Sequence, residues 1–390
     1  MKNLFFICLI LLTQCKTTEK EPVIPEPVPV QQDIAEIDGL INAYMSEFDL
    51  PGVSLAIAKD GALVYLKGYG FADVEKGVEV NPDHVFRIAS CSKAYTGMAI
   101  MKLVEFDAIQ LSDKVFGPGA ILGTQFGTKA YSESLKQITV SQLLLNTSGT
   151  FVNAQKRDLV NMHEELSNED YLSWVLDNSI QEFAPGSAYH YVNVNYFVAS
   201  MIVEAVSGVS FYDFLKNEVL YKIDDEVTAL GVSNSDLSNE VKYYGQGNLA
   251  GHEYDFSMER YIGSGNVVTS AKSLLRFAIS LGPSGRWNLL PTPLMNEFVT
   301  TTPHSPNWGH GIGVWGERLY MYGSLPSTRS GWMLDKQTGL TAAIISNSNA
   351  DYTSAALDQE IAYGQQDLLI DLISKQRAFE DIDQFLTNVF

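Results

Sequence analysis

Ser90 and Lys93 are the residues whose types and spacing point most directly to chemistry. They begin and end Ser90-Cys91-Ser92-Lys93, which is the only Ser-x-x-Lys in the sequence. On a helix, residues three apart share a face, so the hydroxyl and the amine can meet. A lysine can activate a serine when burial and the positive end of a helix lower its pKa, and the backbone N–H of Ser90 can stabilise an oxyanion. Taken alone, the tetrapeptide fits a capping serine beside a solvated lysine better.

A second candidate pair follows about a hundred residues later. Tyr191 precedes Asn193 by two positions, in a stretch that begins at Gly186. This spacing can place a phenol and an amide side by side on a loop, where the phenol could relay a proton to a leaving group and the amide could orient an acyl chain. An aromatic loop packed on the core is the alternative for these residues.

The segments around these residues predict a helix and two strands before Ser90 and a helix after it. Apolar residues recur at helical spacing from Asp33 until Pro51-Gly52 ends the pattern. Two strand-like runs at 53–58 and 62–67 flank a turn. A further helix is predicted from Ser90 to about residue 106.

The rest of the chain predicts a mainly helical insert between strands. Residues 115–258 read as mostly helical, residues 269–281 as one helix, and residues 355–375 as a final helix. Strand-like runs are predicted at residues 311–315, 330–334 and 340–346. This order predicts an α/β fold of the α+β type: an antiparallel sheet flanked by the two terminal helices, with an inserted helical subdomain. A site would lie in the cleft between the two parts.

Several ordered blocks resemble class C serine β-lactamases, the related DD-peptidases (penicillin-binding proteins) and their esterase relatives. The resemblance extends from about residue 33 to residue 375. It implies that Ser90 is the acylated nucleophile, Lys93 its base partner, Tyr191 a second base or proton relay, and Asn193 a substrate-orienting amide. It implies no cofactor, and no Cys/His cluster has the spacing of a zinc site. The blocks that carry it are 86–93, 111–115, 140–149, 185–196 and 263–271.

The third motif of the family departs from its usual pattern. The family has Lys-Thr-Gly, or His-x-Gly in esterase-like members, on a strand beside the cleft. Here Met321 stands at the basic position and Tyr322 at the small or hydroxyl position, while Gly323 is kept. The resemblance implies that the backbone N–H of Ser324 is a second oxyanion donor. Arg329 could replace the missing charge if its side chain reaches the cleft; a surface position at a strand end is the alternative.

Two other basic residues nearby are not expected to replace the missing one. Lys336-Gln337-Thr338-Gly339 reads as a hairpin turn between the last two strands, and His310 begins the preceding strand, upstream of the aligned block. A lysine or histidine at position 321 would hydrogen-bond a substrate carboxylate, which is worth roughly 1.5–3 kcal/mol. Met321 therefore favours substrates without a free carboxylate.

The N-terminus predicts export and lipid anchoring. Lys2 and a short apolar run precede Leu12-Thr13-Gln14-Cys15, which resembles a bacterial lipobox. We expect residues 1–14 to be a signal peptide, Cys15 to be lipidated, and residues 15–32, rich in proline, to form a tether. The catalytic domain would then cover residues 33–388, with the helical insert at about 115–260. An ordinary cleaved signal and an uncleaved anchor are the alternatives.

The net charge and the cysteine content limit the partners and covalent links that we expect for this protein. The formal net charge of −20 argues against nucleic acid and anionic membrane surfaces. We expect contact with a membrane only through the N-terminal lipid, in a periplasmic or cell-surface location. Besides Cys8 and Cys15, only Cys91 remains, so no structural disulfide is expected.

The sequence therefore predicts a serine hydrolase that forms an acyl-enzyme on a small ester, amide or peptide substrate. An esterase or amidase is the first hypothesis. A DD-peptidase or β-lactamase is the second, and a non-catalytic binding protein that kept the fold is the third. No Gly-x-Ser-x-Gly elbow is present.

Overall fold

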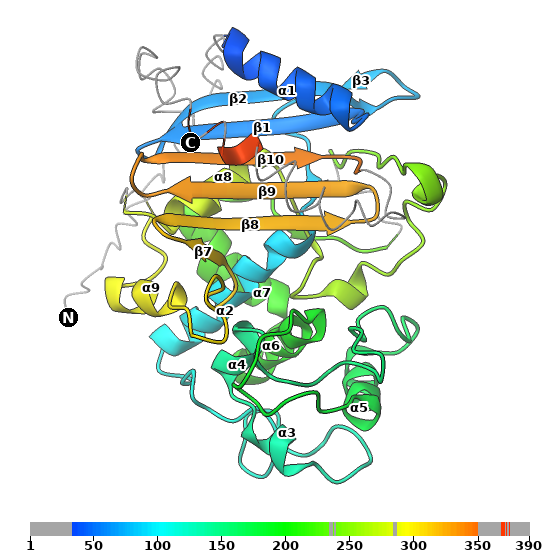
Figure 1. Cartoon of the computed structure of the whole chain (residues 1–390), viewed down its shortest axis with the longest axis vertical. Coiled ribbons are helices and arrows are strands. Elements are labelled where there is room, and N and C mark those ends of the chain that lie inside the picture. Colours follow the sequence, from blue (N-terminus) through cyan, green and yellow to red (C-terminus); the bar gives the residue numbers. More distant parts are fainter. Residues whose placement is uncertain are drawn as a thin grey trace, which may run out of the picture. The chain divides into compact units, whose positions relative to one another are not determined.

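The computed structural model describes residues 33–233, 237, 239–283, 287–349, 368–370, 372 and 374, all within one unit that starts at Gln31 (Figure 1). The predicted signal peptide, Cys15 and the tether lie outside the described residues, as does most of the predicted final helix. The helices are α1 Ala35–Glu47, α2 Ser92–Glu105, α3 Glu133–Gln137, α4 Val140–Leu144, α5 Asn168–Asn178, α6 Asn193–Ser207, α7 Phe211–Leu215, α8 Ala271–Ser280 and α9 Thr292–Phe298. The strands are β1 Gly52–Lys59, β2 Ala62–Asp73, β3 Val78–Glu79, β4 Phe86–Arg87, β5 Ala229–Leu230, β6 Val267–Thr269, β7 Gly313–Trp315, β8 Arg318–Leu325, β9 Thr328–Asp335 and β10 Leu340–Ser346.

The main sheet is antiparallel and joins the two ends of the domain. Its seven strands run in the order β3-β2-β1-β10-β9-β8-β7, so β1 from the start of the domain pairs with β10 from its end. The register places Val53 opposite Ser346. The predicted antiparallel sheet is confirmed.

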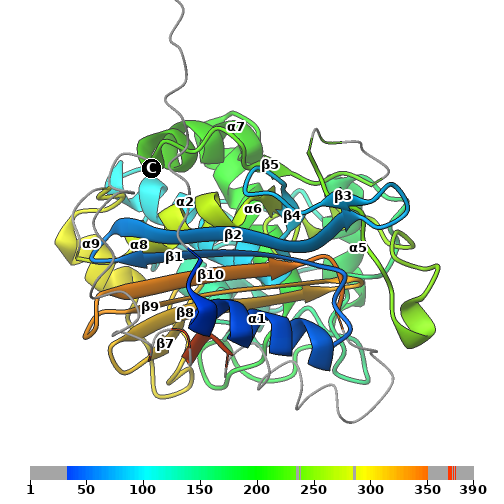
Figure 2. The same ribbon diagram turned by 90° about the horizontal axis from the view of Figure 1, so that it is seen from above.

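Helices cover both faces of this sheet (Figure 2). On one face, Ile37 and Ile41 of α1 pack with Leu369 and Leu372 against the strands. On the other face, α8 lies against β1, β9 and β10, and α2 and α6 lie beyond it. Every residue of β9 and β10 is buried, because both faces of these strands are covered.

Strand β8 differs from its neighbours. Its side chains alternate between partly exposed and buried, which is the pattern of a strand with one covered face. Beyond residue 320 it pairs only with β9 among the described strands, because β7 pairs with residues 318–320. The predicted strand-like runs omit β8, although the family resemblance places the third motif on a strand.

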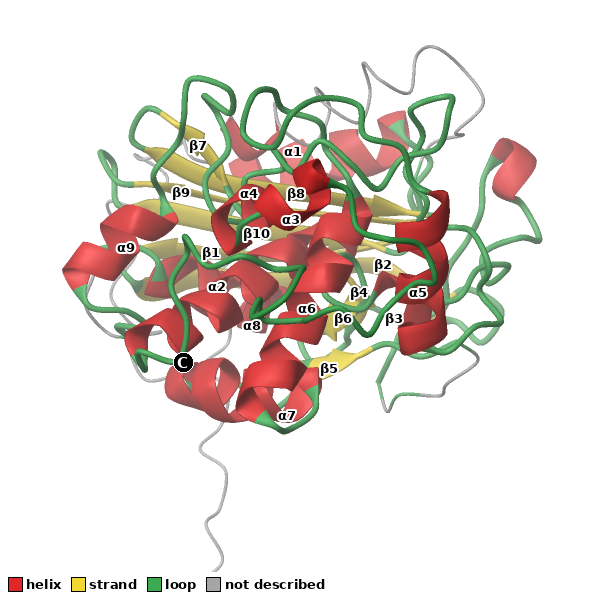
Figure 3. Cartoon of the chain, turned by 90° about the horizontal axis from the view of Figure 1, so that it is seen from below, coloured by secondary structure: helices red, strands yellow, loops and turns green. Residues whose placement is uncertain are grey.

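The inserted region is less helical than predicted. Long loops connect its short helices (Figure 3). Four glycines between residues 117 and 127 have positive φ angles, which glycine alone adopts without strain, and they close turns where a helix was expected. A small second sheet, β4-β6-β5, was also not predicted; each of its strands has only two or three residues, too few to produce an alternation.

Among the described residues, no single helix has both the length and the apolar character to cross a membrane, although the bent pair Asn193–Ser207 and Phe211–Ile223 passes that test together by length and composition.

Candidate active site

Ser90 lies in a tight turn between strand β4 and helix α2. The turn is a short 3-10 helix, Ala89–Cys91, that continues into α2. Ala89 has a φ of 47°, a left-handed conformation that is unusual for a residue with a side chain. Two hydroxyls of β9 hold the backbone of this segment: Thr328 Oγ1 donates to Arg87 O at 2.8 Å, and Ser330 Oγ donates to Ile88 O at 2.6 Å.

Lys93 lies one turn further along and is fully buried. Its Nζ is 3.0 Å from Ser90 Oγ, 2.7 Å from Asn193 Oδ1 and 2.8 Å from the carbonyl oxygen of Ser264. Burial lowers the pKa of Lys93 to about 7, and the negative charge of Asp158 opposes that shift. The predicted pair thus lies within hydrogen-bond distance, with an amine whose pKa is close to neutral.

Tyr191 is the second group on the serine oxygen. Its phenol OH donates a hydrogen bond to Ser90 Oγ at 2.7 Å, and the centre of its ring lies 4.7 Å from Lys93 Nζ. Burial raises the pKa of Tyr191 above its usual value, so the phenol keeps its proton at neutral pH. The structure therefore brings together Ser90, Lys93 and Tyr191, as the sequence predicted.

A partly buried carboxylate, Asp158, supports this group, and no sequence signal marked it. Asp158 accepts hydrogen bonds from the backbone N–H of Val160 at 3.0 Å and from that of Asn193, at the start of α6. An anion is favourable at the positive end of a helix. Burial raises the pKa of Asp158, while the backbone donors and Lys93 act in the opposite direction. Asp158 comes from a loop far from Asn193 in sequence, so spacing could not reveal it.

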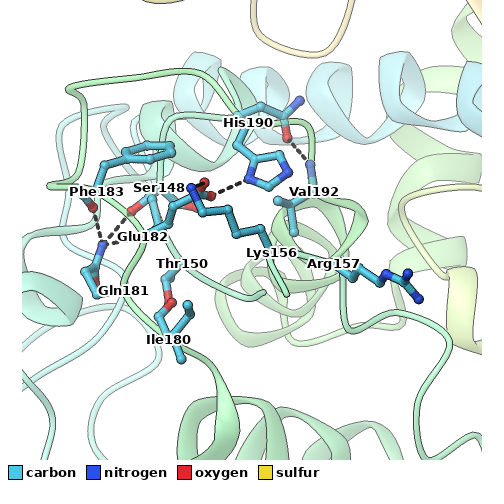
Figure 4. A network of polar contacts seen from close by, with 12 residues as sticks. Ser148, Thr150, Lys156, Arg157, Ile180, Gln181, Glu182, Phe183, His190 and Val192 are labelled. Carbon is cyan, nitrogen blue, oxygen red and sulfur yellow. Dashed lines mark hydrogen bonds and ion pairs between the residues drawn. The ribbon is translucent and has the colours of Figure 1, made fainter. Parts of the chain in front are cut away.

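The loop that carries Tyr191 is fastened by charged residues (Figure 4). Glu182 lies 2.5 Å from His190 Nδ1 and 3.1 Å from Lys156 Nζ. The hydrogen bond from His190 is the largest contribution that lowers the pKa of Glu182. The backbone N–H of His190 donates to the carbonyl of Asn146 at 2.9 Å.

Asn146 occupies the position where the resembling family usually has histidine. Its φ is 56°, in the left-handed region that asparagine tolerates better than most residues. Its Oδ1 accepts from Val192 N at 3.2 Å and from Asn195 Nδ2 at 3.0 Å. Asn146 thus connects the loop of Tyr191 to helix α6 by hydrogen bonds.

Gly323 allows strand β8 to lie directly against the nucleophile turn. A Cβ atom at this position would be 2.2 Å from the carbonyl oxygen of Ile88 and 2.9 Å from the backbone nitrogen of Ser90. Ser324 follows on the same strand, and Asn349 Nδ2 donates to its hydroxyl at 3.2 Å. The backbone nitrogens of Ser90 and Ser324 therefore come from adjoining segments.

The other third-motif residues divide between the two faces of β8. Met321 is only 2% exposed and packs in the core on the side of α2. Tyr322 alternates with it and packs near the cluster formed by α1. The thioether of Met321 thus occupies the position where the family has a basic side chain.

Arg329 does not replace that charge. Its neighbours on β9, Thr328 and Ser330, face the nucleophile turn, so Arg329 points to the opposite face of the sheet. There it is 3% exposed and interacts with Tyr44 of α1. Both expectations for Arg329 are therefore wrong: its side chain neither reaches the cleft nor lies at the surface, because it is buried on the opposite face of the sheet.

Lys336 and His310, which were not expected to replace the missing basic residue, have structural positions. Lys336 to Gly339 form the turn between β9 and β10. His310 is buried, and its ring lies 2.9 Å from both Ser141 Oγ and the carbonyl of Glu297. Among the described residues, no group of three or more His, Cys, Asp or Glu side chains could hold a metal ion.

Trp308 is a further residue of the site that the sequence did not indicate. Its ring meets the Tyr191 ring edge-on, with centroids 5.7 Å apart. Its Nε1 donates to the carbonyl of Leu144 at 2.9 Å and to Tyr196 OH at 3.2 Å. It lies in a loop before β7 with no motif around it.

Comparisons with known proteins found relatives in sequence and in fold. Protein flp of Staphylococcus aureus (strain N315) is 25% identical over 327 residues, which make up 81% of this chain and 64% of that protein. This chain thus spans just under two thirds of that relative. D-amino acid amidase from Ochrobactrum anthropi SV3 superposes with a TM-score of 0.70 at 20% identity, covering 88% of this chain and 99% of the amidase.

A hydrolase with promiscuous acyltransferase activity, EstCE1, superposes with a TM-score of 0.68 at 18% identity, covering 86% of this chain and 98% of EstCE1. The predicted fold, a β-lactamase/transpeptidase-like antiparallel sheet with helices, is confirmed. The family model described as Beta-lactamase matches residues 37–364. This match extends over most of the sequence, and the chain belongs to the beta-lactamase family.

Proposed function

We propose that this protein is a serine esterase or amidase that works through an acyl-enzyme on Ser90. One observation carries the proposal: Ser90 Oγ lies 3.0 Å from an amine whose pKa is about 7 and 2.7 Å from a phenol whose pKa is raised. A base near neutral pKa and an acid that keeps its proton are the two partners that acyl transfer needs.

The hydrogen bonds of Lys93 orient its lone pair. A neutral amine has two N–H donors and one lone pair. Asn193 Oδ1 and the carbonyl of Ser264 accept the two hydrogens, which leaves the lone pair for the hydroxyl of Ser90. As Ser90 attacks the substrate carbonyl, its proton passes to Lys93, and the resulting ammonium has three donors for the same three oxygens.

Tyr191 is suited to the second proton transfer. The tetrahedral intermediate collapses when the bond to the leaving oxygen or nitrogen breaks and that atom takes a proton. The phenol of Tyr191 donates this proton and becomes a phenolate, and the ammonium of Lys93, whose Nζ lies 4.7 Å from the centre of the Tyr191 ring, returns a proton to it. Water then attacks the acyl-enzyme, which releases the acid and regenerates Ser90.

The backbone N–H groups of Ser90 and Ser324 would stabilise the oxyanion. The absence of a side chain at Gly323 supports this role, because it lets β8 approach the nitrogen of Ser90 closely. An oxyanion donor of this kind is worth roughly 10²–10³ in kcat.

The buried thioether of Met321 favours substrates without a free carboxylate. Arg329 faces away from the site, so neither residue offers a charge-assisted hydrogen bond to a carboxylate. DD-peptidase or β-lactamase activity is therefore the weaker proposal, and a non-catalytic binding role is the weakest.

Three substrates separate these functions. The protein is incubated with p-nitrophenyl acetate, a fluorescent penicillin and a D-Ala-D-Ala peptide, and the assays are repeated with Ser90→Ala and with Ser112→Ala, an exposed serine. We expect ester turnover that disappears in Ser90→Ala and persists in Ser112→Ala. Stable penicillin labelling or peptide cleavage would instead support the second proposal. Folded protein with no turnover and no adduct on any substrate would exclude both enzymatic functions.

We also propose that Cys15 is acylated and anchors an exported protein. The apolar run and the lipobox-like segment support this, and both lie outside the described residues. Growth with a labelled fatty acid should label the wild-type protein and leave Cys15→Ser unlabelled. Equal labelling of both would contradict the anchor.

A further inference from the structure

A small pocket with aromatic walls lies beside Tyr191. It is lined by six residues, and its volume is about 270 Å³. This is slightly below the range of roughly 300–1,000 Å³ that is typical of small-molecule sites, so it fits one ring-sized group and not an extended chain. The lining residues are Tyr189, Ser305, Pro306, Asn307, Trp308 and Tyr320.

The pocket shares a wall with the candidate active site. Trp308 lines the pocket and also packs edge-on against the ring of Tyr191 at 5.7 Å. Tyr189 precedes Tyr191 by two residues and is 41% exposed, so its ring is accessible. Trp308 is fixed by its hydrogen bonds to Leu144 and Tyr196, which makes this wall rigid.

Strand β8 supplies the opposite wall. Tyr320 lies three residues before Gly323, and its ring lies over Gly313 of β7, where a Cβ would be only 2.4 Å from the ring. The rings of Tyr320 and Tyr322 are 5.2 Å apart. Gly313 therefore leaves room for the ring of Tyr320, which is one of the residues that line the pocket.

We propose that this pocket binds the leaving group of the substrate, and that the preferred leaving group is a neutral alcohol or amine that carries an aromatic ring. The proposal rests on the proposed acyl-enzyme function and names the part of the substrate that is recognised.

The position of the proton donor decides which part of the substrate enters the pocket. The atom that leaves must receive a proton, so it lies within hydrogen-bond reach of the phenol of Tyr191. Trp308 is in contact with the ring of that same residue. A group attached to the leaving atom therefore meets Trp308 first, whereas the acyl group stays on Ser90.

The chemistry of the walls decides the kind of group. None of the six lining residues is charged, so a charged leaving group would lose hydration without gaining an ion pair. Three aromatic rings offer edge and face contacts to another ring. Asn307 and the tyrosine hydroxyls add only neutral hydrogen-bonding groups at this site.

Two esters with one acyl group test the proposal. Benzyl acetate and ethyl acetate give the same acetyl-enzyme, so any difference in kcat/KM arises before or during acylation. Comparing the benzyl-to-ethyl ratio between variants cancels the intrinsic reactivity of the two esters. We expect the ratio to fall roughly three- to tenfold in Tyr189→Ala and in Tyr320→Ala. Tyr189→Phe keeps the aromatic ring and should therefore keep the benzyl-to-ethyl ratio of the wild type.

An unchanged ratio in both alanine variants would overturn the proposal while the esterase function stands. Failure of the esterase function looks different: the wild type would hydrolyse neither ester. In that case the pocket can still be tested by measuring the binding of benzyl alcohol to Ser90→Ala with ligand-observed NMR. Binding that weakens in Tyr189→Ala and Tyr320→Ala would support the aromatic site, and binding unaffected by both would refute it.

Discussion

The amide oxygen of Asn193 lies 2.7 Å from Lys93 Nζ, closer than the serine hydroxyl at 3.0 Å. The side chain of Asn193 also hydrogen-bonds the carboxylate of Asp158. The family resemblance implied an amide that orients the substrate. In this protein the same amide is engaged between Lys93 and the partly buried Asp158, so we infer that it positions the lone pair of Lys93.

Asn193→Asp tests this relationship through pH. A carboxylate 2.7 Å from Lys93 would favour the ammonium form and raise the pKa of Lys93 above about 7. The reaction needs the neutral amine, so kcat/KM of the wild type should rise with pH through about 7, and that limb should move to higher pH in the variant. A pH–rate profile with a neutral ester measures the shift. A limb that stays in place would mean that Lys93 is not the titrating base.

Lys93→Met should change how stability depends on pH. In the unfolded chain the lysine titrates near 10.5, whereas in the folded protein its pKa is about 7. Between these values unfolding takes up one proton, so this group makes stability rise with pH by about 1.4 kcal/mol per unit. From pH 7.5 to 9.5, the stability of the wild type relative to Lys93→Met should rise by about 2–3 kcal/mol. Guanidinium unfolding of both proteins at both pH values measures this change. If the difference in free energy of unfolding between the wild type and Lys93→Met is the same at both pH values, Lys93 is charged when buried.

Gly323→Ala should damage both folding and activity. The added Cβ would lie 2.2 Å from a backbone oxygen that cannot move freely, and overpacking of this kind costs about 1–3 kcal/mol. Denaturant unfolding and ester hydrolysis measure the two effects. Gly39→Ala in α1 is the matched control, because its Cβ would meet nothing within 4 Å and the change should be neutral or stabilising. Full activity in Gly323→Ala would contradict the proposed approach of β8 to Ser90.

Met321→His restores a basic residue at the third-motif position. If the missing charge excludes carboxylates, the variant should hydrolyse a carboxylate-bearing ester roughly tenfold to a hundredfold better, while a neutral ester is little affected. Met321→Leu keeps the position apolar and serves as the control. Equal changes on both esters in Met321→His would mean that the position acts through packing alone.

Glu182→Gln should loosen the loop that carries Tyr191 (Figure 4). The variant loses the ion pair of Glu182 with Lys156 and replaces the carboxylate that accepts the hydrogen bond from His190 with a neutral amide. We expect ester kcat/KM to fall roughly three- to tenfold, with a stability change below about 1 kcal/mol because the pairs are partly exposed. Lys156→Ala removes only the exposed partner and should have the smaller effect. If both variants match the wild type, the loop does not depend on these pairs.

Local patterns predicted much of the main sheet, and the family resemblance predicted the candidate active-site cluster. Strand-like runs and helical spacing were enough for β1, β2 and α2, whereas the spacing of Ser90 and Lys93 alone favoured a capping serine and pointed to a site only together with the ordered blocks. The ordered blocks then added Tyr191, because its distance along the chain matches the resembling family.

Contacts between distant segments could not be predicted in the same way. Asp158 and Trp308 reach the site from loops without a motif, and their roles depend on three-dimensional packing. The error at Arg329 has a simple origin: a one-residue step along a strand reverses the face, and the sequence alone did not fix which face it takes. Too much helix was predicted in the insert, because glycines with positive φ angles form turns there that interrupt the chain between short helices.

The pairing of β1 with β10 ties the site to the order in which the chain is made. Val53 meets Ser346, so the strands that hold the nucleophile turn cannot assemble until nearly the whole domain has emerged. Contacts between such distant residues form slowly in folding. The site would therefore stay incomplete while the last strands are still being synthesised, and we expect a shortened product that lacks β10 to lose the proposed hydrolytic activity.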